Sequence, residues 1–421
     1  MTRVLTAVSG GVDSGVSASL LLERGFEVSG LFMRHRYQRR ASEEESREAL
    51  ARWGASARFR AWTLTSTDVD SLVELPMNVD SLPFALPVDA ASALELCATL
   101  GIELNLLDVD VPFAAIVENF ATSYYAAQTP NPCAFCNRLI KFGLLWDVAR
   151  RWGAERLATG HYVRALRVGA WLDEIEATEP DVFDQIPEWL KTFPDDVFIA
   201  RSPSPKDQSY FLYGIRHDVL QNVVFPVGEL DKNEVRRIAA AKGLNVSQRK
   251  DSQEICFVPD QDRLRFMRDL RAEIPKLRES VPEDTSGDFI DLDGKTIGRH
   301  EGYEKYTVGQ RKGLGMGFGE RIFVQKIDPV ARAVALGPYD ALAVEEIRAV
   351  DANWHARVPF DEAFRCEVKI RYRNESTPAT ARATADGRVV ARLDKPCFGV
   401  APGQALVCYW RDRLLGGGRI L

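Results

Sequence analysis

The sequence contains little cysteine and no long apolar segment. Its seven cysteines in 421 residues are odd in number and too few for the disulfide framework of a secreted domain. No apolar run approaches the ~18 residues that a membrane-spanning helix needs. The N-terminal segment MTRVLTAVSGG is too short and too soon rich in glycine for a secretory signal. We therefore expect a reduced, cytoplasmic protein with no membrane partner.

An excess of positive charge is also missing. The 54 Lys and Arg residues are outnumbered by 60 Asp and Glu residues, and the formal net charge is −6. The charge is uneven, because residues 341–421 carry 13 Lys and Arg against 10 Asp and Glu (+3), while the remainder carries 41 against 50 (−9). A polyanion would bind more favourably to the C-terminal end. The length and the 46% of hydrophobic residues are compatible with two or three domains.

The first part of the chain alternates short apolar runs with helical patterns, which predicts an α/β fold. The pattern predicts strands at 4–8, 26–33, 103–109 and 156–159, and helices at 12–24, 91–100 and 139–152. Strand and helix in this order imply a parallel sheet with helices on both faces. Two stretches, 34–88 and 173–196, interrupt the pattern, and we expect them to be solvated loops on the surface of the sheet domain.

The pattern changes after about Pro259. A last amphipathic helix is expected at 263–277 and a linker at 282–287. From residue 288 onwards, short β-like runs separated by Gly, Pro and Asp predict small barrels. We therefore predict an α/β domain at 1–258, a small central β-rich domain at 259–340 and a C-terminal β-barrel at 341–421.

The hexapeptide Ser9–Ser14, SGGVDS, lies where the first strand turns into the first helix. Backbone N–H groups and the positive end of a helix converge at such a turn, which suits a phosphate group. Gly10 and Gly11 allow close approach, and the hydroxyls of Ser9 and Ser14 can donate to phosphate oxygens. The lysine of a Walker loop is absent. An ordinary strand–helix turn is the alternative, and the full hexapeptide favours phosphate.

Two cysteines, Cys133 and Cys136, precede a helix that we expect to begin near Arg138. The helix dipole and Lys141 would stabilise a thiolate there. The C-x-x-C spacing alone is shared by redox pairs, zinc sites and iron–sulfur ligands, and no second C-x-x-C supports structural zinc. Cys256 is the natural distant partner. The remaining cysteines are expected to be small buried hydrophobic residues: Cys97, Cys366, Cys397 and Cys408.

Nine segments together resemble the bacterial tRNA-specific 2-thiouridylases, and SGGVDS alone resembles the signature of the wider class of PP-loop ATP pyrophosphatases. The resemblance covers nearly the whole chain. The segments are SGGVDS (9–14), TPNP-x-x-x-CN-x-x-IKFG (129–143), ATGHY (158–162), KDQSYFLY (206–213), KDSQEICF (250–257), YTVGQRKGLG (306–315), IRYR (370–373), APGQA (401–405) and LLGGG-x-I (414–420).

The resemblance implies a PP-loop domain, a small central domain and a C-terminal barrel. It also implies a reaction that replaces the C2 oxygen of the tRNA wobble uridine with sulfur, consuming ATP and releasing AMP and pyrophosphate. Cys136 would be the nucleophile and Cys256 the persulfide carrier, and we expect Asp13 to hold the Mg²⁺ that accompanies ATP. A persulfide-donating sulfur carrier or a cysteine desulfurase would be the second partner, besides tRNA.

The resemblance assigns two further sets of residues. The residues implied to hold ATP are Ala7, Val8, Ser9, Gly10, Gly11, Val12, Asp13, Ser14, Met33 and Gly160. Those implied to face the target base or the tRNA are Asn131, Pro132, Cys133, His161, Lys206, Asp207, Gln208, Arg371, Tyr372 and Gln404. In a strand, Arg371 and Arg373 would lie on one face. The cations and Tyr372 would then suit phosphate contact and base stacking, although a solvated strand face has the same pattern.

Three features depart from the family, and alternatives remain open. Cys133 stands where an acidic residue is frequent, Gly15 replaces a serine, and the long stretch 34–88 follows Met33. In one alternative, Cys133, Cys136 and Cys256 bind an iron–sulfur cluster. The others are a PP-loop enzyme acting on a small molecule, disfavoured by the cysteine pair and the barrels, and a tRNA-binding protein without catalysis, disfavoured by the intact loop and cysteines.

Overall fold

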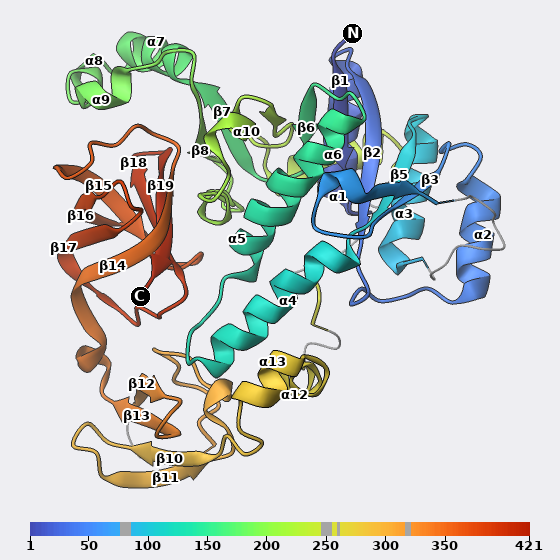
Figure 1. Ribbon diagram of the computed structural model, residues 1–421. Helices are drawn as coiled ribbons and strands as arrows, with labels where there is room; N and C mark the ends of the chain where they lie inside the picture. The colour runs from blue at the N-terminus through green and yellow to red at the C-terminus, as the bar shows by residue number, and fades with distance from the viewer. Residues whose placement is uncertain (76–85, 246–254, 259–261, 316–320) are drawn as a thin grey trace. The chain divides into compact units, whose positions relative to one another are not determined.

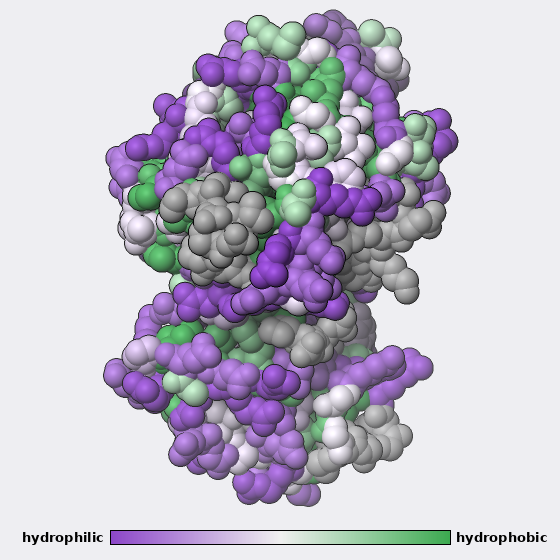
Figure 2. Space-filling model, turned by 90° about the vertical axis from the view of Figure 1, so that its right-hand side faces the viewer, coloured by the Kyte–Doolittle hydropathy of each residue, from purple (hydrophilic) through white to green (hydrophobic). Residues whose placement is uncertain are grey.

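The computed structural model describes residues 1–75, 86–245, 255–258, 262–315 and 321–421 (Figure 1). The chain forms two compact units. The N-terminal unit contains residues 1–115 and 136–261, and the C-terminal unit contains residues 116–135 and 262–421. None of the helices in the described ranges has the length and apolar character needed to cross a bilayer. The face in Figure 2 is mostly hydrophilic, with hydrophobic residues in small scattered groups.

The N-terminal unit is built on a sheet that has seven strands among the described residues, in the order β4-β3-β5-β2-β1-β6-β9. Only the β3–β4 pair is antiparallel; the others are parallel. Because β2 and β6 flank β1, the chain reverses direction beside β1, where α/β sheets bind ligands. The bounds are β1 Arg3–Ala7, β2 Glu27–Arg34, β3 Arg60–Leu64, β4 Leu72–Glu74, β5 Leu104–Asp108, β6 Arg156–Ala158 and β9 Val223–Val224.

Helices cover the sheet and bury a continuous apolar cluster. Val16 and Leu21 of α1, Leu94 of α3 and Val235 of α11 pack in it with Leu104 of β5. This burial fixes α1, and with it the loop that precedes α1. The helices are α1 Val12–Glu23, α2 Glu43–Trp53, α3 Val88–Leu100, α4 Asp110–Tyr125, α5 Pro132–Cys136, α6 Leu145–Arg151, α10 His217–Leu220 and α11 Lys232–Ala241, with a π-helix at Asn137–Leu144.

The expected strands of the first part and the helices at 12–24 and 91–100 are confirmed, but the prediction that 34–88 is a solvated loop is wrong. Strand β3 pairs with β5 and extends the parallel sheet, and β4 forms its edge. Ala61 and Leu64 are buried, so the short run RAWTL contributes to the core. Helix α2 packs on α3 and begins with a capping box between Ser42 and Glu45.

The prediction that 173–196 is a solvated loop is also wrong. It lies between the antiparallel strands β7 Val163–Arg167 and β8 Val197–Arg201 and takes part in helices α7 Val168–Thr178, α8 Pro180–Phe183 and α9 Glu188–Lys191. Trp171, Ile175 and Leu190 are buried. Trp171 and Ile175 are four residues apart, a helical spacing that the acidic composition of the segment obscured.

The C-terminal unit contains the expected central β-rich region and the C-terminal barrel. In the described residues, the central sheet has the order β11-β10-β13-β12, and six strands, β14-β17-β16-β15-β18-β19, form a barrel that β14–β19 pairing closes. The helix expected at 263–277 is divided at Pro275 into α12 Arg263–Glu273 and α13 Pro275–Ser280.

The strands of this unit are β10 Gly287–Ile290, β11 Thr296–His300, β12 Phe323–Asp328, β13 Ala333–Gly337, β14 Ala343–Trp354, β15 Ala363–Lys369, β16 Thr377–Ala383, β17 Val389–Phe398, β18 Ala405–Trp410 and β19 Arg413–Ile420. Short 3-10 turns in the two units lie at Val69–Ser71, Ser209–Phe211, Tyr303–Lys305 and Tyr339–Leu342.

Candidate functional site

The loop between β1 and α1 is ordered by its own serines. The backbone N–H of Ser9 donates to Oγ of Ser14 (3.1 Å), and that hydroxyl donates to the carbonyl oxygen of Gly11 (3.0 Å). Gly10 has φ +72°, and a Cβ there would lie 2.3 Å from the carbonyl oxygen of Asp89. Gly11 is the N-cap of α1 and provides no side-chain cap, so the first turn of α1 is suited to an anion.

Gly160, which follows β6, lies directly against this loop. A Cβ at Gly160 would be 2.8 Å from the carbonyl carbon of Asp13 and from the backbone nitrogen of Ser14. Only glycine permits this approach. The structure thus brings together two segments to which the family resemblance assigns nucleotide binding, at the sheet position where the chain reverses direction.

The carboxylate of Asp13 is held by two side chains that the sequence analysis did not identify. Nζ of Lys232, at the start of α11, lies 2.8 Å from both carboxylate oxygens. The hydroxyl of Tyr162 donates to Oδ1 at 2.6 Å. Across the described residues, no three His, Cys, Asp or Glu side chains form a group that could hold a metal. Asp13 is therefore the centre of an ion-pair network in this structure.

The segment around Lys206–Gln208, expected to touch tRNA, supports Tyr162. The backbone N–H of Gln208 donates to the carbonyl oxygen of Tyr162, and Oε1 of Gln208 accepts from the backbone N–H of Tyr162, both at 3.0 Å. The carboxylate of Asp207 accepts from the backbone N–H of Ser202 and from Ser209. The N–H of Lys206 donates to Oγ of Ser204 (3.3 Å). Asp207 and Gln208 therefore order this loop beside the Asp13 network.

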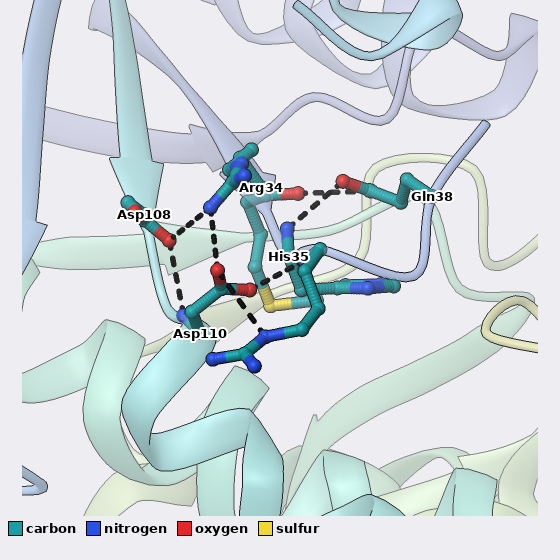
Figure 3. Close-up of polar contacts among 7 residues, drawn as sticks. Arg34, His35, Gln38, Asp108 and Asp110 are labelled. Atoms are coloured by element: carbon teal, nitrogen blue, oxygen red, sulfur yellow. Dashed lines mark hydrogen bonds and ion pairs between the residues drawn. The ribbon is translucent and has the colours of Figure 1, made fainter. Parts of the chain in front are cut away.

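Met33 lies near the end of β2, and the residues after it form the polar network of Figure 3. Nε2 of Gln38 donates to the carbonyl oxygen of Met33 (3.1 Å), and Oε1 of Gln38 accepts from the backbone N–H of His35 (2.9 Å). Gln38 thereby closes a tight turn at the end of the strand. The backbone around Met33 is therefore fixed by the side chain of Gln38, which belongs to the stretch 34–88.

Arg34 also stabilises the turn that follows β2, through two carboxylates. Nη1 of Arg34 contacts Oδ1 of Asp108 (2.9 Å) and Oδ2 of Asp110 (2.7 Å), and the Arg34 side chain is only 7% exposed (Figure 3). The backbone N–H of Arg36 also donates to Asp110. Two carboxylates on one buried guanidinium join the ends of β2 and β5 to the start of α4, so the turn is rigid.

His35 is buried and stacks on Phe113, with ring centroids 3.9 Å apart and an interplanar angle of 5°. Burial lowers the pKa of His35 to about 4 against the opposing effect of Asp110, so the imidazole is neutral at pH 7. Phe113 in turn contacts Phe257 edge-on at 5.8 Å. Phe257 is the residue after Cys256, and this aromatic contact places the Cys256 turn against the first residues of α4.

The helix that carries Cys133 and Cys136 begins earlier than expected. Oδ1 of Asn131 accepts from the backbone N–H of Ala134 (3.1 Å), so Asn131 is the N-cap and Pro132 the first residue of α5. The prediction of a start near Arg138 is wrong, because this Asn-Pro signal already starts a helix. Cys136 lies one turn inside the helix, not before it, and only Cys133 is in the first turn.

The two cysteines of α5 differ in exposure, since Cys133 is exposed and Cys136 is buried. Directly after Cys136 the helix adopts π geometry over Asn137–Leu144 and then continues as α6. Nδ2 of Asn137 donates to the carbonyl oxygen of Phe211 (3.2 Å). Insertions of π geometry concentrate at functional sites, which supports a functional role for the residues at this junction.

Cys256 is exposed in a short turn, whereas Lys250–Glu254 of its motif lie outside the described residues. The other cysteines contrast with it. Cys97, Cys366 and Cys408 are buried, as predicted, and Cys397 is half-buried. Burial raises the pKa of Cys97 to about 12, so its thiol stays protonated and unreactive.

His161 is half-buried beside Gly160. Its Nδ1 is 2.7 Å from Oγ1 of Thr159, and its ring contacts Phe142 with centroids 5.7 Å apart. Burial and, to a smaller extent, Lys141 lower the pKa of His161 well below its ordinary value. A neutral imidazole at pH 7 can donate or accept a hydrogen bond but does not attract phosphate by charge.

In the C-terminal unit, the prediction that Arg371 and Arg373 share a strand face is wrong. Strand β15 ends at Lys369, and the backbone N–H of Asn374 closes a turn on the carbonyl oxygen of Arg371 (3.2 Å). Nη2 of Arg371 donates to the carbonyl oxygens of Val308 (2.7 Å) and Gly399 (2.6 Å). The guanidinium of Arg371 is thus bound to the protein's own backbone at the turn that follows β15.

Gln404 contacts the segment that leads into α5. Its Nε2 donates to the carbonyl oxygens of Thr129 (3.1 Å) and Pro130 (3.2 Å), and the backbone N–H of Thr129 donates to the carbonyl oxygen of Pro402 (2.7 Å). The loop 401–404 therefore holds Thr129 and Pro130, the first two residues of the TPNP segment. Tyr372 lies near Lys369, whose Nζ is 5.8 Å from the centre of the Tyr372 ring.

Comparison with protein families matches almost the whole chain. The matching families are described as thiamine biosynthesis protein (ThiI) over residues 1–76, tRNA methyl transferase HUP domain over 77–260, tRNA methyl transferase PRC-barrel domain over 276–338 and aminomethyltransferase beta-barrel domain over 344–420. The last two coincide with the central β-rich region and the closed barrel.

Two similar proteins are both named tRNA-specific 2-thiouridylase MnmA. The protein of Chloroflexus aggregans is 37% identical, with 100% of this chain and 98% of that protein covered. The protein of Syntrophotalea carbinolica is 35% identical, with 99% and 98% covered. A solved structure, the U34-tRNA thiolase NcsA from Methanococcus maripaludis with its 4Fe-4S cluster, aligns at 16% identity and a TM-score of 0.28 over 66% and 68% of the two chains, too little for any inference. The identities over full length show that the chain belongs to the family of tRNA-specific 2-thiouridylases.

Proposed function

We propose that this chain is an ATP-dependent sulfurtransferase that replaces the C2 oxygen of the tRNA wobble uridine with sulfur. The observation that carries the proposal is the contact of Gly160 with the SGGVDS loop beside the N-terminus of α1, where a phosphate group would be bound. Membership of the 2-thiouridylase family supports this activity for the site. The protein would act in the cytoplasm, where its substrate tRNA is found.

The first step would be adenylation of the substrate oxygen. The uridine C2 oxygen attacks the α-phosphorus of ATP, the bond between the α- and β-phosphates breaks, and pyrophosphate leaves with the electron pair. The residues proposed to hold the phosphates run from Ala7 to Ser14 and include Gly160, while the fixed turn at Met33 would face the adenine. The uncapped first turn of α1 would bind the negatively charged phosphates.

Mg²⁺ would supply charge neutralisation for the nucleotide. Both oxygens of Asp13 contact Lys232 in this structure, whereas Mg²⁺ in nucleotide sites is held by one or two carboxylates together with the substrate phosphates. We propose that Mg²⁺ arrives with ATP as the counter-ion of its phosphates. Asp13 then acts within the ion-pair network and not as a fixed metal ligand.

The second step would transfer sulfur. The terminal sulfur of a persulfide on Cys256 attacks C2 of the adenylated uridine, and AMP leaves. The thiolate of Cys136 then attacks the Cys256 sulfur, a Cys136–Cys256 disulfide forms, and the thiolated base is released. A dithiol reductant returns both thiols. The exposure of Cys256 suits loading by a persulfide-donating sulfur carrier or a cysteine desulfurase, and the burial of Cys136 suits protection from solvent oxidants.

The iron–sulfur alternative requires Cys133, Cys136 and Cys256 as a ligand set. Membership of the 2-thiouridylase family favours persulfide transfer over this alternative, and persulfide transfer needs only Cys136 and Cys256. Cys133 would then be an auxiliary thiol beside the target base.

We propose that tRNA is bound by residues of the segments 1–258 and 341–421. The positive balance of 341–421 supports a phosphate-binding role for the barrel end of the chain. The residues proposed to contact the base or the tRNA remain Asn131, Pro132, Cys133, His161, Lys206, Asp207, Gln208, Arg371, Tyr372 and Gln404.

The decisive experiment measures pyrophosphate release with ATP and unmodified tRNA, followed by mass spectrometry of the tRNA nucleosides. The proposal expects release that depends on the tRNA, and 2-thiouridine when a persulfide donor and a reductant are added. Cys136→Ser is the matched control, since it should adenylate tRNA but not thiolate it. Pyrophosphate release with a small molecule and none with tRNA would contradict the proposal.

A further inference from the structure

The phosphate-binding loop contains an acid but no base. Asp13 is the single charged residue of Ser9–Ser14, and the lysine that a Walker loop would provide is missing. A carboxylate beside a triphosphate raises the electrostatic cost of binding unless a cation compensates it. The compensating cation must therefore come from outside the loop or arrive with the nucleotide.

Lys232 brings such a cation to the loop from a distant part of the sequence. Its Nζ is 2.8 Å from each oxygen of Asp13, and its side chain is 14% exposed. The hydroxyl of Tyr162 binds Oδ1 of the same carboxylate, and the ammonium lies 5.9 Å from the centre of the Tyr162 ring. The carboxylate and the ring thus fix an ammonium group at the edge of the anion site.

The position of Lys232 is set by the fold. Asp231 caps α11 by accepting from the backbone N–H of Glu234 (2.8 Å), and Val235 of the first turns packs in the same apolar cluster as Val16 of α1. Since Lys232 is the first residue of α11, burial of this helix against α1 delivers its side chain to Asp13.

We propose that Lys232 is the phosphate-binding cation of this site, with Asp13 and Tyr162 as the residues that position it. The inference rests on the proposed function only in taking ATP as the anion. A lysine ammonium can contact a phosphate oxygen while it keeps its carboxylate partner. Its charge would offset that of the pyrophosphate leaving group, which develops when the bond between the α- and β-phosphates breaks.

The opposing explanation is a structural ion pair that merely joins α11 to α1, and the chain contains a matched example. Lys242, at the other end of α11, forms an ion pair with Glu23, the last residue of α1. This pair joins the same two helices at the end away from the loop. Lys242→Met is therefore the control for any effect of removing a lysine that connects α1 and α11.

The test compares full-length Lys232→Met, Lys232→Arg and Lys242→Met. Affinity for a non-hydrolysable ATP analogue with Mg²⁺ is measured by calorimetry, and pyrophosphate release is measured in a single turnover with unmodified tRNA. We expect Lys232→Met to release pyrophosphate about 100-fold to 1,000-fold more slowly, as for loss of one charge-stabilising donor, and to bind the analogue more weakly. Lys232→Arg should recover part of the rate of pyrophosphate release and part of the affinity for the analogue. Lys242→Met should match the unmodified chain in both measurements.

Tyr162→Phe provides a second route if Lys232→Met fails to fold. It keeps the ring but removes the hydroxyl from Asp13, and it should lower the rate of release more than the affinity for ATP. Equal behaviour of Lys232→Met and Lys242→Met in both assays would overturn the inference and leave the proposed function standing. If the unmodified chain releases no pyrophosphate with tRNA, the proposed function fails, and weaker analogue binding by Lys232→Met still decides the role of Lys232.

Discussion

The side-chain amide of Gln38 donates to the carbonyl oxygen of Met33 at 3.1 Å, so the strand end proposed to face adenine is held by a residue five positions further on. Gln38→Ala removes this bond and the one to the N–H of His35. A lost hydrogen bond of this kind costs about 0.5–1.5 kcal/mol, and we expect ATP to bind roughly threefold to tenfold more weakly. Calorimetry with an ATP analogue measures this, with the exposed Gln185→Ala as the control.

Asp13→Asn should keep the fold and lose adenylation. The amide retains the shape of the carboxylate, but it no longer balances the Lys232 ammonium, so the group that faces the phosphates is misplaced. We expect single-turnover release of pyrophosphate to fall by about 100-fold or more, with an unchanged circular dichroism spectrum. Full activity in this variant would remove the PP-loop interpretation of Ser9–Ser14.

Substitution of the three cysteines named in the proposed chemistry should have different effects on thiolation activity. Cys136→Ser and Cys256→Ser should each form no 2-thiouridine, because each loses one sulfur of the transfer, whereas Cys133→Ala should keep much of its activity in air. Thiolation assays on the three variants check this, with Cys397→Ala as the control. Brown, iron-containing protein from anaerobic purification that loses iron and activity in Cys133→Ala would show that the persulfide role of Cys256 is wrong.

Arg371 and Arg373 should have different effects although they are two residues apart. Arg371→Ala removes the donors to two backbone carbonyl groups, so we expect a loss of about 1–3 kcal/mol in the free energy of unfolding together with weaker tRNA binding. Arg373→Ala, at an exposed position, should leave stability unchanged. Denaturant unfolding and tRNA titrations at several salt concentrations distinguish these effects.

Binding of tRNA should weaken steeply as salt rises, because each phosphate contact releases counterions. The slope of the logarithm of the binding constant against the logarithm of the salt concentration should be smaller in variants that have lost a phosphate contact. Binding of the ATP analogue should be unchanged in Arg371→Ala, since that residue belongs to the C-terminal unit. An affinity for tRNA that does not depend on salt would contradict this prediction.

His35 predicts a loss of stability in mild acid. Its pKa is about 4 in the folded chain and about 6.5 when unfolded. Below pH 6.5 the unfolded chain therefore binds a proton that the folded chain does not. The free energy of unfolding should fall between pH 6.5 and pH 4, by up to about 3 kcal/mol from this residue. His35→Phe retains the stack on Phe113 and should reduce this slope in denaturant titrations; an unchanged slope would assign it to other groups.

Local signals account for what the sequence predicted correctly. The apolar run before Ser9, the glycines of the loop and the β-like runs after residue 288 each act over a few residues, and the corresponding strands, loop and barrel are present. The start of α5 was also signalled locally, by Asn131-Pro132, which lies well before the predicted start near Arg138. Strand β3 was missed because a five-residue run after a highly charged stretch has no periodicity of its own, and only pairing with β5 makes it a strand.

The Asp13 network could not be predicted in the same way. Lys232 is 219 positions from Asp13, and nothing in the motif around it marks it as a partner of the loop. The ion pair between Lys232 and Asp13 forms because α11 packs on α1, which is a property of the tertiary structure. The sequence did contain an imbalance, because the loop expected to bind phosphate carries one acid and no cation, and this imbalance predicts a compensating cation from another part of the chain.

Pro402 and Gln404 form three hydrogen bonds with the backbone of Thr129 and Pro130, so the C-terminal barrel cannot be removed without disturbing that backbone. Residues near the C-terminus bind the backbone immediately before the helix that begins at Pro132. An enzyme shortened by removal of the barrel would thus lose more than affinity for its substrate, because the approach to Cys133 would lose three of its hydrogen bonds. The barrel and the cysteine helix must be exchanged together in any chimera between relatives.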